Sequence, residues 1–286
     1  MAKDPMHFEI LHRTSYDYTA PVALGAHTIR LRPRCDGTQQ LVDFRLDIHP
    51  RPQHVSDYLD HEGNHVSVVS FEGKTLKLSI TSRLRIETLR ENPRDYLVEP
   101  GFRTLPATYT ASVGELLTGY LQQQALPAGD PLVKFTAALI ERSACDPLRF
   151  LDLLNMEIHN GIEREIRETG EPLSPRATLA RGRGACRDMA SLFIAASRHA
   201  GFAARFVSGY QKGDQSRPRR YLHAWPEVYI PGGGWRGFDP THGLAVADEH
   251  VPVAAASRSI DAAPIEGSYF GDAESSMQTE VSIRTS

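Results

Sequence analysis

The segment Gly182-Arg183-Gly184-Ala185-Cys186-Arg187-Asp188 decides the interpretation of this 286-residue chain, because it puts a cysteine two residues after a pair of spaced glycines and at the start of an apolar helix. The two glycines allow the backbone to turn sharply. Residues from Cys186 to about Ala200 then show the apolar period of a helix, which Gly201 ends. The thiol therefore lies at the positive end of a helix dipole, which favours the thiolate.

Two more residues follow in the order of a catalytic triad. His223 lies in Leu222-His223-Ala224-Trp225, and Asp239 ends the stretch Trp235-Arg236-Gly237-Phe238-Asp239. Both stretches have the composition of strands. A neutral thiol is a weak nucleophile at pH 7, and an adjacent imidazole held by a carboxylate turns it into the thiolate. We therefore expect Cys186 as nucleophile, His223 as base and Asp239 as the residue that orients the base, in an acyl transfer through a thioester.

Each of these residues also has an ordinary structural interpretation when it is taken alone. A lone cysteine that starts an apolar helix is usually a small core residue. His223 could be a half-buried strand histidine, and Asp239-Pro240 is by itself a turn signal. Only the combination of the three residues in this order indicates catalysis.

Three neighbouring residues are candidates for contact with the substrate. Trp225 and Trp235 could wall the acyl site, although strand aromatics are as often part of a core. Arg187 adds a positive charge beside the thiol. The polar segment 211–221 is expected to be a solvated loop, and a mobile lid with the arginines Arg217, Arg219 and Arg220 is the alternative.

The first third of the chain has a different pattern from the rest. From about residue 6 to 90, apolar and polar residues alternate, most regularly over 42–48 and 76–86. This period of two predicts half-buried antiparallel strands, and so a β sandwich or barrel.

Helical patterns begin after a proline-rich transition. Ser112 and Glu115 have the spacing of a capping box, and Asp130-Pro131 has the cap-then-proline start of a second helix. Apolar residues over 150–162 predict a third. The sequence therefore predicts an α+β protein with an N-terminal β domain at 1–105 and a catalytic core at 106–286.

Composition argues against several classes of function. The net charge of −3 and the pI near 6.5 give no basic field for nucleic acid. The chain has no apolar run of about 18 residues, and its start lacks the apolar stretch of a secretory signal, so we expect a cytoplasmic protein without a membrane partner. Cys35, Cys145 and Cys186 are an odd number without C-x-x-C spacing, which favours neither disulfides nor zinc. We expect no cofactor and no metal.

The motif Gly184-x-Cys186-x-Asp188-x-Ala190, followed by 203–210, 223–229 and 234–241, resembles the bacterial transglutaminase-like superfamily of candidate cysteine peptidases. The stretches 16–22 and 30–34, with Gly63-Asn64, resemble the β domain that precedes the core in this family. The resemblance implies a papain-like core of helices packed on an antiparallel sheet, with Cys186, His223 and Asp239 in the roles given above. It also implies that a C-terminal strand, about 278–285, packs back on the β domain.

The favoured function is that of a cysteine peptidase or amidase that acts on a peptide or amide substrate. One alternative is a protein-glutamine transglutaminase, in which a lysine amine replaces water. An arylamine N-acetyltransferase has the same residue order, but its nucleophile follows a short helical region rather than a long β domain. A non-catalytic scaffold of the same fold is the alternative from another class. Many relatives have glutamine at the position of Arg187 and histidine at that of Ser191, so the substrate stays open, as do the oligomeric state and the pathway.

Overall fold

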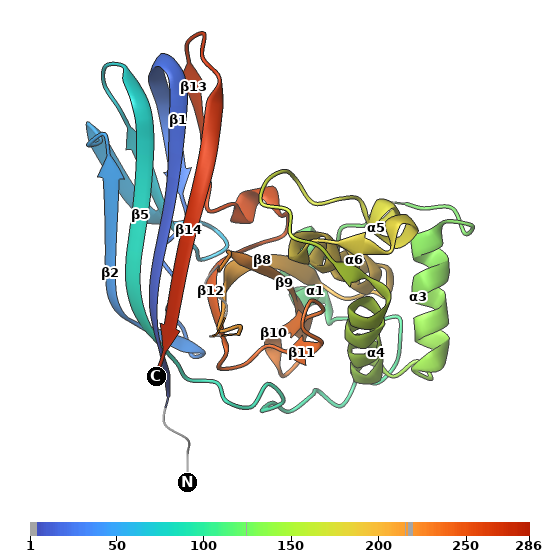
Figure 1. Cartoon of the computed structure of the whole chain (residues 1–286). Helices are drawn as coiled ribbons and strands as arrows, with labels where there is room; N and C mark the ends of the chain where they lie inside the picture. Colours follow the sequence, from blue (N-terminus) through green and yellow to red (C-terminus); the bar gives the residue numbers. More distant parts are fainter. Residues whose placement is uncertain (1–4, 124, 215, 217–219) are drawn as a thin grey trace.

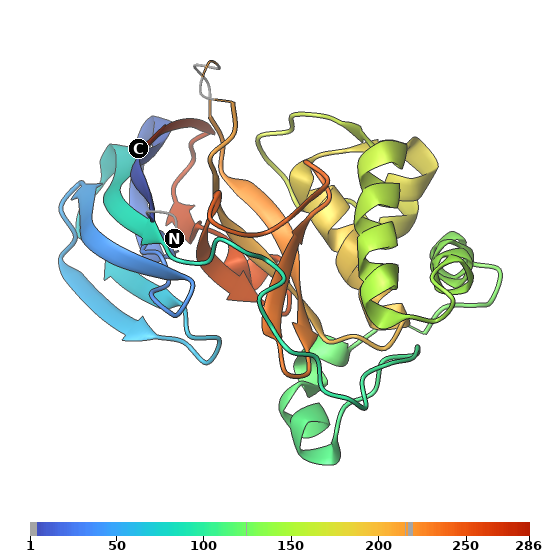
Figure 2. The same ribbon diagram turned by 90° about the horizontal axis from the view of Figure 1, so that it is seen from below.

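The computed structural model describes residues 5–123, 125–214, 216 and 220–286. A tall antiparallel β module stands beside an α+β core, and the curled sheet of the core lies between that module and the helices (Figures 1 and 2). This arrangement confirms the predicted fold class. The division at residue 105 remains a prediction, since strands from the C-terminal end also join the β module.

The β module is organised around one long strand, β1 (Met6–Ile29). Its first part pairs with β5 (Thr75–Thr88), and β5 pairs in turn with β2 (Gln39–His49). Its last residues pair with β4 (His65–Ser70), beside which β3 (His54–Leu59) forms an edge. The alternation seen in the sequence has its cause here, because Leu78, Ile80, Leu84 and Ile86 of β5 all point into a buried core.

Two strands from the C-terminal end complete this sheet. β14 (Ser275–Thr285) pairs antiparallel with β1 from Phe8↔Thr285 to Tyr18↔Ser275, without a register shift. It covers the stretch 278–285 for which the family resemblance implies a returning strand. β13 (Ile265–Phe270), which the sequence analysis did not predict, pairs with the other end of β1. Figure 1 shows both red strands standing against the blue strand β1.

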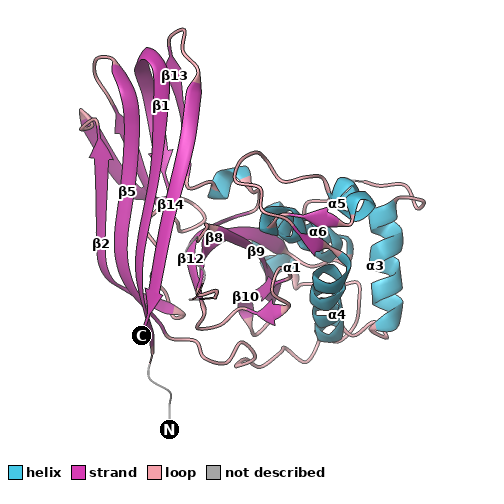
Figure 3. Cartoon of the chain, in the orientation of Figure 1, coloured by secondary structure: helices cyan, strands magenta, loops and turns pink. Residues whose placement is uncertain are grey.

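The sheet of the core is antiparallel, in the order β11-β10-β9-β8-β12. Its strands are β8 (Ala204–Gln211), β9 (His223–Ile230), β10 (Gly234–Asp239), β11 (Leu244–Ala245) and β12 (His250–Ala256). Helices gather on the side away from the β module (Figure 3). They are α3 (Pro131–Arg142), α4 (Pro147–Gly161), α5 (Pro175–Arg181) and α6 (Cys186–His199). A short 3-10 turn at Ile260–Ala262 and a two-residue parallel pair of β6 (Glu163–Arg164) with β7 (Arg183–Gly184) complete the core.

Asp130, Asp146 and Ser174 cap the starts of α3, α4 and α5, whereas the two short helices that precede them have no side-chain cap. Asp130 accepts a hydrogen bond from the Leu132 N–H at 2.9 Å and caps α3 as predicted. The expected single helix from Ser112 is instead broken into α1 (Ala111–Leu116) and α2 (Thr118–Leu121), and no side chain caps α1. α1 begins at Ala111, so Ser112 lies inside the helix and cannot cap it, and the helical run is interrupted at Leu117.

The β module and the core share a hydrophobic cluster. Phe8, Ile10 and Ile283 of the module pack with Tyr210 and Val251 of the core, and Phe8 is only 1% exposed. Burial of large side chains from both parts stabilises the contact between them. Within the described residues, no helix has the length and apolarity needed to cross a bilayer.

Candidate active site

The candidate nucleophile occupies the first position of α6. Behind it the helix is anchored by buried residues such as Met189, Phe193 and Ile194, so the thiol has a fixed place. Cys186 itself is partly exposed and lines a cavity of about 1060 Å³. The first N–H groups of a helix have no acceptor inside it, so those of Cys186 and Arg187 are placed to stabilise negative charge near the thiol.

Asp188 fixes the segment that leads to the nucleophile. Its fully buried carboxylate accepts hydrogen bonds from the N–H groups of Ala185 at 2.8 Å and Leu173 at 2.7 Å, and from the Arg167 guanidinium at 2.5 Å. Gly184 packs tightly beside it, since a Cβ there would lie 3.0 Å from the Asp188 Cβ and would push the two apart by a few tenths of an ångström. This buried carboxylate has a structural role in holding the loop and the start of α6 together.

Arg187 lines the cavity, but its guanidinium is used by the protein itself. It donates to the carbonyl oxygen of Arg167 at 2.6 Å and to that of Thr169. The side chain therefore holds the loop at 164–172, which forms one wall of the cavity. Its charge also contributes to lowering the pKa of the Cys186 thiol.

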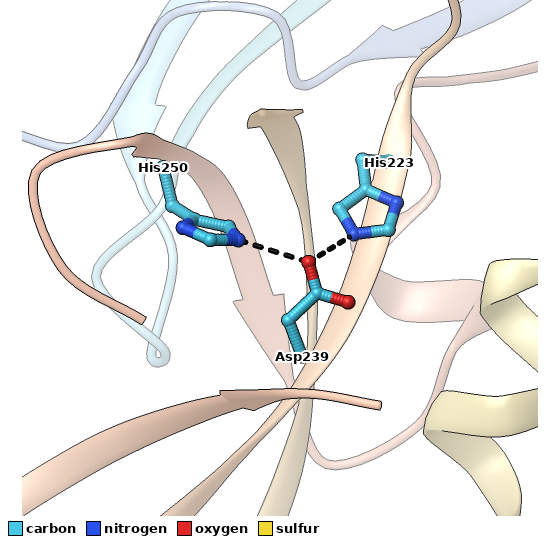
Figure 4. Close-up of side chains that lie close together, drawn as sticks. All are labelled: His223, Asp239 and His250. Atoms are coloured by element: carbon cyan, nitrogen blue, oxygen red, sulfur yellow. Dashed lines mark hydrogen bonds and ion pairs between the residues drawn. The ribbon is translucent and has the colours of Figure 1, made fainter. Parts of the chain in front are cut away.

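His223 begins β9, and Asp239 ends the neighbouring strand β10. The His223 Nε2 donates to the Asp239 Oδ2 at 2.8 Å, and both side chains are buried. In Figure 4 the other ring nitrogen of His223 points away from Asp239. That nitrogen, Nδ1, is the one left for the Cys186 thiol, whose ionisation is influenced by a hydrogen bond with His223. The structure thus brings the three predicted residues into one site.

Charge in this site favours a thiolate–imidazolium pair. Burial by itself would raise the pKa of the Cys186 thiol, but the hydrogen bond and the charge of His223, with the Ala224 N–H, lower it below its usual value. Burial likewise acts to lower the pKa of His223, and the Asp239 carboxylate outweighs it and raises that pKa to about 10. The pKa of Asp239 lies well below its usual value despite burial, because His223, His242 and His250 all donate to it.

Two of these histidines were missed by the sequence analysis. The His242 Nδ1 donates to the Asp239 Oδ2 at 2.7 Å, and the His250 Nε2 donates to the same oxygen at 3.0 Å. His242 lies three residues after Asp239 in the turn that follows β10, and this spacing was a usable signal. His250 begins β12, a strand that the sequence analysis did not predict, so no local pattern connected it with Asp239.

The group His223, Asp239 and His250 also has the composition of a metal site, with its ligand atoms within 4.8 Å of one another. Figure 4 shows that both imidazoles are directed at one carboxylate oxygen. Two N–H donors that converge on a single acceptor form a hydrogen-bond network, and such a network accounts for this arrangement.

The two tryptophans do not lie where substrate contact requires them. Trp225 is fully buried, packs against Val207 and Ala255, and has its ring 5.8 Å from that of His223. Trp235 stacks under the Arg205 guanidinium, 4.2 Å from its ring centroid. Neither lines the cavity that holds Cys186. Trp225 thus packs beside His223 within the core, and the expectation of an acyl-site wall does not fit this geometry.

The cavity lies between the core and the β module. His12, Thr14 and Tyr16 of β1 and Met277 and Thr279 of β14 line it on one side, opposite Cys186 and His223. The polar segment 211–221 contributes described residues such as Lys212 and Arg220 to the lining. Arg217, Pro218 and Arg219 lie outside the described residues, so the solvated loop and its alternative, the mobile lid, both remain predictions.

Comparisons with known proteins agree with this architecture. Residues 8–87 match the family model for the bacterial transglutaminase-like N-terminal region, and residues 136–240 match that of the transglutaminase-like superfamily. An uncharacterised protein of Mycobacterium bovis is 28% identical over 284 residues, which cover 94% of this chain and 90% of that protein. A protein-glutamine gamma-glutamyltransferase of Pseudomonas aeruginosa is 38% identical over 69 residues, 22% of this chain and 10% of the other.

A solved structure has the same fold over almost the whole length. The crystal structure of a candidate cysteine protease from Cytophaga hutchinsonii superposes with a TM-score of 0.73 and 21% identity, covering 99% of this chain and 91% of that one. The order of β module and core is therefore shared, as is the returning C-terminal strand region. With both family models matched in this order, the chain belongs to the transglutaminase-like superfamily and carries that family's bacterial N-terminal region.

Proposed function

We propose that this protein is a thiol-dependent acyl-transfer enzyme, a cysteine peptidase or amidase that works through a thioester on Cys186. One observation carries the proposal. The His223 Nε2 donates to Asp239 at 2.8 Å, so that Nδ1 is free to hydrogen-bond with the Cys186 thiol at the N-terminus of α6. The size of the cavity, about 1060 Å³, supports a substrate larger than a simple amide.

The cycle begins with the thiolate of Cys186, which attacks the carbonyl carbon of an amide. The developing oxyanion is stabilised by the backbone N–H groups at the start of α6, which carry the positive end of the helix dipole. The imidazolium of His223 gives its Nδ1 proton to the leaving amine, and the C–N bond breaks. Neutral His223 then takes a proton from water, and the resulting hydroxide equivalent hydrolyses the thioester.

Asp239 keeps its charge throughout this cycle. Its carboxylate fixes His223 in the tautomer that has Nδ1 toward the sulfur, and it stabilises the imidazolium. The additional donors His242 and His250 hold the carboxylate in place and spread its charge. Asp239 is therefore a positioning residue, while Cys186 and His223 exchange the proton.

The test is turnover by Cys186→Ala beside the matched variant Cys145→Ala. Cys145 is an exposed cysteine that does not line the cavity of Cys186, so its loss should leave activity intact. Hydrolysis of unfolded casein and of p-nitrophenyl acetate should be lost in Cys186→Ala and kept in Cys145→Ala, with unchanged circular dichroism in both. Full activity in folded Cys186→Ala would remove the proposal.

Transamidation is the second candidate function, and the short match to a protein-glutamine gamma-glutamyltransferase favours it. In this version a lysine amine, rather than water, attacks the thioester. Incorporation of a fluorescent primary amine such as dansylcadaverine into casein separates the two reactions. The cytoplasmic location and the peptide or amide substrate remain our predictions, to be tested by cell fractionation and by a peptide library.

A further inference from the structure

We propose that the outer edge of β14 beside the cavity binds the substrate as an added antiparallel strand, so that the substrate is an extended, unfolded stretch of polypeptide. The inference rests on the proposed function for the identity of the occupant. Three observations define the edge: the register of β14 on β1, the side chains of β14 that line the cavity, and the bridge between Arg220 and Val281.

The register of β14 on β1 shows which of its backbone groups face outward. His7 and Ser286 exchange both hydrogen bonds, at 3.0 and 3.1 Å, and the Thr19 N–H donates to the Glu274 carbonyl at 3.1 Å. Bonded pairs alternate with non-bonded pairs in an antiparallel ladder, and this ladder has no register shift. Even-numbered residues of β14 therefore bond to β1, and odd-numbered residues direct their N–H and C=O groups to the outer edge.

Three odd-numbered residues of β14 line the cavity that contains Cys186, namely Met277, Thr279 and Ile283. Of these, Met277 and Thr279 lie between the bridged Val281 and the start of the strand at Ser275. Among the described residues, the strand pairings of β14 involve β1 and, on the outer side, Arg220 alone. Edge backbone groups of this kind form a template for another strand.

The pairing with Arg220 shows that the edge accepts an antiparallel partner. Arg220 forms a bridge with Val281, an odd-numbered residue, as the register requires. From there the chain leaves the edge and reaches the catalytic His223 three residues later. The outer edge at 277–279 is thus the position that this segment vacates as it turns into the active site.

Distances along the chain place the edge within reach of the thiol. Three extended residues span at most about 10 Å from Arg220 to His223, and Val281 to Thr279 is about 7 Å. A strand of about six residues is about 20 Å long. One short segment can therefore pair with Met277 and Thr279 and still present an amide to Cys186.

The chemistry of the edge selects a conformation rather than a sequence. Backbone hydrogen bonds supply affinity in strand addition, and only alternate side chains meet pockets. Most backbone groups of a folded protein are already paired within it, whereas those of an unfolded or flexible segment are free to pair with this edge. The inferred substrate class is consequently an extended peptide segment.

The experiment removes one outward N–H. Proline lacks this group and is tolerated on the outer side of an edge strand. Thr279→Pro removes the donor in the cavity, and Ser275→Pro makes the same change at an odd-numbered residue of β14 that does not line the cavity. Thr279→Ala keeps the N–H and changes the side chain alone. Each is made in the Cys186→Ala protein, and binding of fluorescein-labelled unfolded casein is measured by anisotropy.

We expect Thr279→Pro to weaken casein binding about three- to tenfold, as the loss of one backbone hydrogen bond implies. Ser275→Pro should bind as the parent does, and Thr279→Ala should lose less than Thr279→Pro. Equal binding by Thr279→Pro and Ser275→Pro, or no binding of casein by the parent, would overturn the inference. Because binding is measured without the nucleophile, a failure of the proposed function appears separately, as absent turnover by a protein that still binds casein.

Discussion

The substitution Asp239→Asn tests whether the Cys186 thiol is ionised by the His223–Asp239 pair or is an ordinary buried thiol. In the native site the Asp239 carboxylate accepts from His223 at 2.8 Å, from His242 Nδ1 at 2.7 Å and from His250 at 3.0 Å, all at Oδ2. Its Oδ1 accepts from the Thr241 N–H at 3.0 Å. An asparagine can keep the bond at Oδ1, but its NH2 group then faces three imidazole N–H donors.

The variant should therefore hold His223 in the wrong tautomer. Nε2 must lose its proton to accept from the asparagine, and the remaining proton moves to Nδ1, beside the sulfur. Neutral His223 cannot take the thiol proton there, and burial alone lowers the pKa of its imidazole. The thiol of the variant consequently moves toward an ordinary pKa of about 8.5, which leaves about one molecule in 300 ionised at pH 6.

The size of the effect on alkylation follows from this fraction. A thiolate of lower pKa is intrinsically less reactive, which offsets part of the native advantage. We expect iodoacetamide to alkylate Cys186 about 10- to 100-fold more slowly in Asp239→Asn than in the native protein at pH 6. At pH 9 the two proteins should be alkylated at nearly the same rate. The pair of ionised groups persists in the native protein until His223 deprotonates near its pKa of about 10.

The assay is alkylation followed peptide by peptide with mass spectrometry from pH 5 to 9. The exposed Cys35 and Cys145 serve as internal references in both proteins. Equal rates at Cys186 in the two proteins at pH 6 would refute the argument that Asp239 acts through His223 on the thiol.

Two further predictions concern stability. Asp188→Asn should lower the free energy of unfolding by about 2–4 kcal/mol in urea denaturation, because it leaves Arg167 and two N–H groups without a buried carboxylate. The control Asp152→Asn removes a carboxylate from an exposed pair with Arg94 and should lower the free energy of unfolding by at most about 1 kcal/mol. Equal losses of stability in the two variants would contradict the structural role of Asp188. Phe8→Ala should lower the free energy of unfolding by about 3–5 kcal/mol. Because Phe8 packs with Tyr210 of the core, the unfolding transition followed by tryptophan fluorescence should shift together with the one followed by circular dichroism. An unmoved fluorescence transition would show that the β module unfolds independently.

Local sequence was sufficient where a repeating pattern determined the structure. The alternation at 76–86 predicts β5, and the apolar period after Cys186 predicts α6, because each element buries one face. The capping box proposed at Ser112 failed because the helix begins one residue earlier, at Ala111, so that Ser112 lies inside it.

Tertiary contacts determined what the sequence could not. β9 and β8 separate β12 from β10 in the core sheet, so His250 reaches Asp239 because the sheet is curled, and no local spacing connects the two. Trp225 lies two residues after His223 on the same strand, so it shares a face with the histidine and packs behind it. The two-residue spacing of His223 and Trp225 was visible in the sequence. The sequence did not show which of the two side chains would be next to the cavity.

The proposed mechanism requires a thioester on Cys186, and detecting this intermediate tests the mechanism directly. The wild-type protein is mixed with p-nitrophenyl acetate, quenched in acid within the first turnovers and mapped by peptide mass spectrometry. The account predicts an acetyl group on the peptide that contains Cys186, and none on that peptide in Cys186→Ala. Turnover of the ester with acetyl groups only on Cys35, Cys145 or lysines would contradict it.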